Sequence, residues 1–80
     1  MRPPSETTLF DRVVAASGLT PLIAPYTIRR LLLRANVVPP ERVTVEQLEA
    51  ALPSLVEGLR VYLPREDQDA AREALEALVA

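Results

Sequence analysis

The sequence contains no cysteine, no histidine and no lysine. Without cysteine there is no disulfide bond and no thiolate ligand for a metal. Without histidine the chain lacks the commonest zinc ligand and the side chain that most often carries out acid–base catalysis near neutral pH. Small domains often use disulfides or metals to support a thin core. We therefore expect this chain to depend on helix packing or on a partner subunit.

The remaining polar side chains do not suggest an active site. Serine and threonine nucleophiles need an adjacent base, and neither histidine nor lysine is present to serve as one. The acids form solvent-facing patterns, such as Glu73 and Glu76 beside Arg72. The run Glu66–Asp69 lacks the glycine and the ligand spacing of a calcium loop. We expect a protein that is not an enzyme and that binds no metal and no cofactor.

Long apolar runs are also missing. No stretch of about 18 apolar residues is available to span a membrane. The segment Met1–Ser5 lacks the apolar core of a signal peptide. These features predict that the chain has no membrane partner and a cytoplasmic location.

The charged residues that are present are unevenly distributed. All nine basic residues are arginine. Codon bias in a GC-rich, bacterial-type genome explains this choice better than bidentate recognition of carboxylate or phosphate does. Residues 1–44 carry a net charge of +3 and residues 45–80 a net charge of −5, which gives −2 for the chain. This asymmetry favours steering of a partner, head-to-tail pairing with another copy, or complementary faces within one bundle.

Hydrophobic spacing predicts an all-α protein, a small compact bundle of about four helices. The length allows one domain, which we place at residues 6–80 after a disordered N-terminal lead at residues 1–5. The first helix is expected from Glu6 to Ala16, with Ser5 as its N-cap. Gly18 is expected to end it in a left-handed conformation.

The second helix is expected after Thr20-Pro21, a typical N-cap and first helical residue. Because Pro25 clashes with a carbonyl four residues back, we predict a turn at residues 21–24 and the main helix from Pro25 to Ala35. Asn36 can end this helix in a left-handed conformation. Residues 37–42, built on Pro39-Pro40, are predicted to be an extended, rigid linker.

The third helix begins with the clearest local signal, the capping box Thr44-Val-Glu-Gln47. Apolar residues then recur at helical spacing from Leu48 to Tyr62. Pro53 interrupts this run, so we expect the helix to be kinked or split there. Pro64 is expected at the start of the fourth helix. Gly58 marks either a close helix contact, within the chain or across a dimer, or mere tolerance of glycine.

An arginine-rich stripe on the second helix is the candidate partner-binding site. It carries one unexpected leucine, and arginine, tyrosine and leucine together are typical of interface anchors. We therefore predict a non-catalytic protein–protein interaction module, an adaptor or regulatory subunit, whose partner is another protein or a second copy in a homodimer. The candidate residues are Tyr26, Arg29, Arg30, Leu33 and Arg34.

Nucleic-acid binding is the alternative. The order of a helix, Gly18 and an arginine-bearing helix is similar to a helix-turn-helix, which would imply a small DNA-binding or transcription-regulatory domain with the second-helix arginines on phosphates. Two features depart from that pattern, because Pro25 falls within the second helix and Val14 takes a place usually held by a small residue. The net charge is also acidic, whereas nucleic-acid binders usually present a basic field. The protein-binding hypothesis is therefore placed first.

Overall fold

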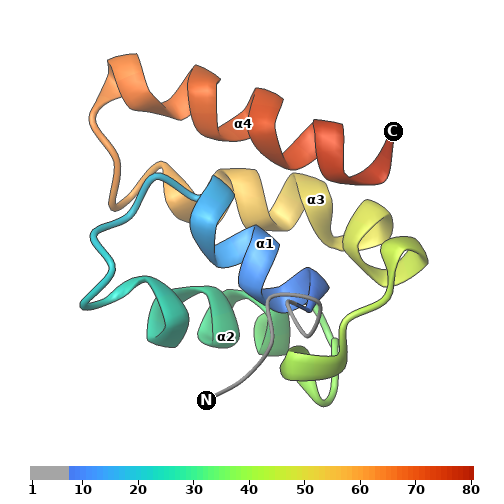
Figure 1. Ribbon diagram of the computed structural model, residues 1–80. Coiled ribbons are helices and arrows are strands. Elements are labelled where there is room, and N and C mark those ends of the chain that lie inside the picture. The colour runs from blue at the N-terminus through green and yellow to red at the C-terminus, as the bar shows by residue number, and fades with distance from the viewer. Residues whose placement is uncertain (1–7) are drawn as a thin grey trace.

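The computed structural model describes residues 8–80, which form a bundle of four α-helices with a short 3₁₀ helix (Figure 1). No strand occurs within this range, so the predicted all-α fold is confirmed. The predicted disordered lead at residues 1–5 lies outside the described residues. The elements in chain order are α1 (Leu9–Ala16), α2 (Ala24–Arg34), η2 (Pro40–Arg42), α3 (Val45–Leu59) and α4 (Arg65–Val79).

Helix α1 begins later than predicted. Its N-cap is Thr8, whose hydroxyl accepts from the Asp11 amide at 3.1 Å while the Asp11 carboxylate accepts from the Thr8 amide at 3.2 Å. The predicted start at Glu6 is therefore wrong. A capping box needs a side chain that can accept a hydrogen bond from the N-cap amide, usually an acid or amide, three residues after the N-cap. Ser5 has Thr8 at that position, whereas Thr8 has Asp11. Gly18 ends the helix with a φ of 77°, as predicted.

Helix α2 has nearly the predicted bounds. Pro25 lies in its first turn, where the missing amide is not needed, and Asn36 follows the helix with a φ of 67°. Thr20 does not act as its N-cap, because Ile23 takes that position without a side-chain hydrogen bond. The backbone carbonyl of Thr20 instead accepts from the amides of Ile23 and Ala24.

The segment between α2 and α3 is not an extended linker throughout. Pro39 has extended dihedral angles, but Pro40 starts the 3₁₀ helix η2 and is buried. The fixed φ of proline fits the first position of a helical turn as well as an extended chain. The amides of Arg42 and Val43 close this turn by donating to the carbonyls of Pro39 and Pro40. This hydrogen-bonded turn leads the chain into α3.

Helix α3 is one helix from Val45 to Leu59 with Pro53 inside it, so Pro53 does not split it. The predicted capping box is confirmed, with the Thr44 hydroxyl 3.1 Å from the Gln47 amide and the Gln47 side-chain oxygen 3.0 Å from the Thr44 amide. The helix ends before Tyr62, which is exposed in the turn to α4 rather than packed on a helix face.

The early end of α3 follows from Leu63-Pro64, because a residue before proline is disfavoured in helical geometry. The chain tightens into a turn in which the Tyr62 amide donates to the carbonyl of Leu59. Pro64 then stands as the N-cap of α4, and the Gln68 side chain donates to the Leu63 carbonyl at 3.0 Å.

The core lies where α3 meets α2 on one side and α4 on the other, with α1 contacting both α2 and α4 (Figure 1). Each aliphatic side chain that is fully buried in this core stabilises the fold by about 1.5–3 kcal/mol relative to an exposed one. The buried cluster comprises Phe10, Val13, Ile28, Leu31, Leu32, Val37, Val43, Leu48, Ala51, Leu55, Leu59, Leu63, Ala71 and Leu75.

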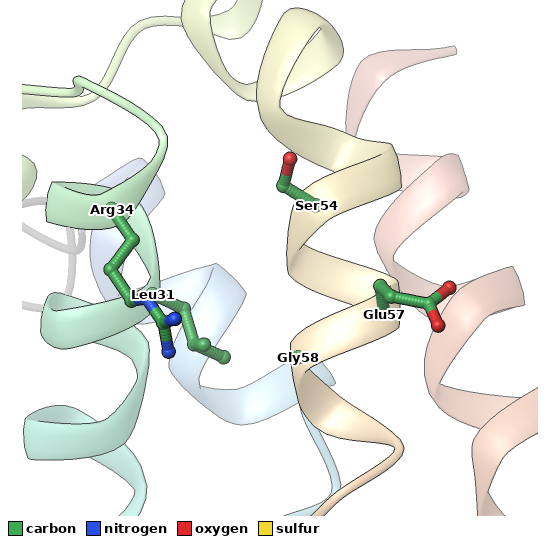
Figure 2. Close-up of a pocket in the computed structure, with 5 residues that line it drawn as sticks. All are labelled: Leu31, Arg34, Ser54, Glu57 and Gly58. Carbon is green, nitrogen blue, oxygen red and sulfur yellow. The ribbon is translucent and has the colours of Figure 1, made fainter.

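Gly58 marks a close helix contact within the chain. A Cβ added at this position would lie 2.5 Å from the Cδ2 atom of Leu31 on α2. Figure 2 shows Leu31 reaching from α2 toward Gly58 on α3. The hydrogen side chain of Gly58 therefore leaves room for Leu31, which gives the intramolecular form of the close contact expected from the sequence.

Replacing Thr44 by Ala removes one half of the α3 capping box and should lower the free energy of unfolding by about 1 kcal/mol. Urea titration monitored by circular dichroism measures this change. Thr20→Ala is the matched control, because no hydrogen bond of that side chain occurs among residues 8–80, and we expect a change below about 0.5 kcal/mol. Equal effects of the two substitutions would contradict the capping role.

Gly58→Ala should be coupled to Leu31. Alanine favours a helix interior over glycine by about 1 kcal/mol, but overpacking against Leu31 costs about 1–3 kcal/mol. We expect Gly58→Ala to be neutral or destabilising in the natural chain and stabilising in a Leu31→Val background, which lacks the δ carbons. A double-mutant cycle of urea unfolding measures the coupling. Identical effects of Gly58→Ala in both backgrounds would show that the contact imposes no steric constraint.

Candidate interaction surface on the outer face of α2

The outer face of α2 brings four of the five predicted residues together. Tyr26, Arg29, Arg30 and Leu33 line one shallow surface hollow with Thr27. Their spacing places them on one side of the helix, since residues three, four and seven positions apart share a face. Tyr26 is 77% exposed and Leu33 is 38% exposed, so both apolar side chains are available to a partner.

Arg34 is the fifth predicted residue and lies in a different place. It lines the notch between α2 and α3, together with Leu31, Ser54, Glu57 and Gly58 (Figure 2). One further step of about 100° around the helix from Leu33 accounts for this position. Arg34 therefore flanks the hollow of Tyr26 and Leu33 without lining it.

Sequence reasoning missed two exposed apolar residues next to this face. Leu22 is 85% exposed and Ile23 is 43% exposed, and they lie in the turn that leads into Tyr26. They stand between Pro21 and Pro25, where no helical periodicity reveals which side chains will be buried. We call the set Leu22, Ile23, Tyr26, Arg29, Arg30 and Leu33 the α2 face.

Two further apolar residues lie at the same end of the molecule. Val61 and Tyr62 are exposed in the turn between α3 and α4, and Figure 1 places this turn at the same end as the α1–α2 turn. The two turns lie close together, because a Cβ added at Gly18, in the α1–α2 turn, would lie 3.8 Å from the side chain of Leu63, in the α3–α4 turn. The sequence pattern did not reveal this cluster, because it placed Tyr62 on the apolar face of the third helix. Large apolar residues gathered at one end of a small domain are typical of a binding surface.

One arginine of the α2 face is engaged within the chain. The Arg29 guanidinium lies 2.7 Å from the Glu41 carboxylate of η2. Both side chains are about half exposed, at 55% and 50%, so solvent screens this pair and it adds little stability. The pKa of Glu41 is lowered, first by the hydrogen bond from its own backbone amide and then by the hydrogen bond from Arg29.

The other arginines of α2 are positioned differently. Among residues 8–80, no carboxylate lies within 4.0 Å of Arg30 or Arg34. Their guanidinium groups present donors in a planar fork that suits carboxylate or phosphate. Arg30, between Tyr26 and Leu33, therefore combines a charged donor with apolar contact area on one helix face.

Three kinds of feature are absent from residues 8–80. Within residues 8–80, no three histidine, cysteine, aspartate or glutamate side chains gather as a metal site would require. No buried side-chain nitrogen or oxygen in the same range lacks a hydrogen-bond partner. No helix in this part of the chain is both long enough and apolar enough to cross a membrane.

Comparisons with known proteins found no matching family model, no matching curated protein and no matching solved structure. Function is therefore inferred from the α2 face and the charges around it.

The Glu41 carboxyl group should report its contact with Arg29. Because the folded-state pKa of Glu41 is lowered, its contribution to stability is present above the unfolded pKa and is lost as the pH falls through the folded pKa. Arg29→Ala should raise the pKa of Glu41, measured as the midpoint of its side-chain carboxyl signal in an NMR titration. Arg30→Ala is the control and should leave that midpoint in place. An unmoved midpoint in the Arg29 variant would assign the whole shift to the backbone amide.

Proposed function

We propose that this protein is a non-catalytic protein–protein interaction module, an adaptor or regulatory subunit, that binds its partner through the α2 face. The observation that carries the proposal is the exposure of Tyr26 next to Arg30 on a helix whose opposite side is buried, with Leu22 exposed in the turn that leads into that helix. Interfaces are enriched in tyrosine and arginine, and their anchors combine apolar area with a polar group.

The energetic argument concerns the apolar area left in water. A tyrosine buries about 150–250 Å² when it is covered, and each Å² of apolar surface removed from water contributes about 25 cal/mol. Covering Tyr26 together with Leu22 and Leu33 therefore offers several kcal/mol before the costs of association are subtracted. Arg30 adds specificity, because its guanidinium forms strong, directional hydrogen bonds with a carboxylate placed opposite it.

The partner is expected to offer an apolar groove bordered by acidic residues. Such a groove would cover Tyr26 and Leu33 and pair with Arg30, whereas Arg29 already has Glu41 beside it. A cytoplasmic location is part of the proposal and is supported by the lack of cysteine, since small secreted domains are usually rich in disulfides.

DNA binding stays the second candidate because α2 is an uninterrupted helix that exposes Arg29, Arg30 and Arg34. Pro25 lies in the first turn of α2 and so does not break a recognition helix. The connection from α1 to α2 covers residues 17–23, however, which is longer than the three- or four-residue turn of a helix-turn-helix. This length favours the protein-binding function.

A pull-down from an extract of the native cell compares the tagged natural chain with tagged Arg30→Glu protein. We expect the natural chain to retain a partner that the Arg30→Glu protein does not retain. Partners are identified by mass spectrometry and their affinity is then measured with the purified proteins. We expect Arg30→Glu and Tyr26→Ser each to weaken binding at least about tenfold, as a loss of 1.4 kcal/mol or more implies. Far-ultraviolet circular dichroism checks that both variants keep their helices.

The matched control is Arg65→Glu, the same charge reversal at an exposed position in the first turn of α4. It should leave the affinity unchanged. Equal loss in the Arg30 and Arg65 variants would contradict a specific α2 face. DNA binding in a gel shift that weakens steeply with salt and is lost in the Arg30 variant would favour the second candidate instead.

A further inference from the structure

A groove lies between α3 and α4, and α4 packs on the side of α3 opposite to α2 (Figure 1). Its floor is apolar, because Leu52 and Val56 are only partly buried there and Pro53 is exposed beside them. Its rim is charged. The lining residues are Glu49, Leu52, Pro53, Val56, Glu57, Arg72 and Glu76.

The charge of this groove is negative. Three carboxylates and one guanidinium line it, and that guanidinium, Arg72, lies 3.7 Å from Asp69 outside the groove. Glu57 lies 3.7 Å from Arg60, whereas no arginine among residues 8–80 is within 4.0 Å of Glu49 or Glu76. An apolar floor with unpaired acids on its rim suits a helix that presents apolar residues and arginine.

The α2 face has this chemistry. Tyr26 and Leu33 lie on the same side of α2, about 10 Å apart along the helix axis. Arg30 lies between the two apolar side chains, where a rim carboxylate would meet it. We infer that the α3–α4 groove receives the α2 face of a second copy of this chain, an inference that rests on the proposed function because it uses the same α2 face.

The geometry makes this contact head-to-tail. Helix α2 packs on one side of α3 and α4 on the other (Figure 1), so a chain cannot place its own α2 face in its own groove. Each copy then offers one α2 face and one groove, and these are different surfaces. Such heterologous contacts extend into open assemblies or close into rings, in contrast to a two-fold dimer.

Sedimentation velocity at rising protein concentration and low salt tests this arrangement with two variants. Arg30→Glu disables the α2 face, and Glu49→Arg disables the groove. We expect the natural chain to form species larger than a dimer and each variant alone to associate at least tenfold more weakly. An equimolar mixture of the two variants should associate again, because the intact α2 face of one variant meets the intact groove of the other and the two reversed charges also attract one another.

The controls carry the same charge changes outside both surfaces. Arg65→Glu and Glu73→Arg are exposed on α4 and should assemble like the natural chain. A natural chain that stays monomeric at every concentration overturns the inference, and so does a mixture of the two variants that stays monomeric. Assembly that Arg30→Glu abolishes and Glu49→Arg leaves intact would mean a symmetric contact between α2 faces and would also overturn it.

These failures can be told apart from failure of the proposed function. If the natural chain is monomeric but Arg30→Glu still loses a partner protein that Glu49→Arg retains, the interaction module stands and only the head-to-tail assembly fails. If Arg30→Glu retains every partner and the natural chain is monomeric, both fail.

Discussion

Helix α3 packs against α2 on one side and against α4 on the other, and its buried row Leu48, Ala51, Leu55 and Leu59 serves both contacts. A chain of this length depends on these two contacts for its core, because small domains bury only a modest share of their surface. The double contact therefore decides which sides of α2 and α4 remain in water. Gly58 lets α2 approach, and the outer face of α2 is exposed as a consequence.

The same packing separates the charges. Arg29 and Arg30 line a hollow on the outer face of α2, whereas three carboxylates of α3 and α4 line the groove between those two helices. The charge difference between the two halves of the sequence thus becomes a difference between two surfaces. Among residues 8–80, no ion pair joins the two halves, because the Arg29–Glu41 pair lies within the first half and the other two pairs lie within the second.

Local signals in the sequence predicted the parts of the fold that local chemistry controls. The Thr44 capping box and the left-handed Asn36 are determined by a few neighbouring residues, and both are present in the structure. Pro40 and Tyr62 were predicted wrongly, because the burial of one and the exposure of the other depend on where distant helices lie. The grouping of Tyr26 with Arg30 and Leu33 followed from helix geometry alone. The diversion of Arg34 toward α3 could be seen only once the helices were packed.

The positive surface of this protein consists of guanidinium groups alone, since the chain has no histidine and no lysine. A guanidinium cannot be deprotonated in a protein, so the positive charge of the α2 face does not depend on the pH. Ionic strength acts on the charges of both surfaces, because salt at about 0.15 M screens exposed charges over about 8 Å. A contact built on these surfaces would therefore respond to the salt content of its surroundings.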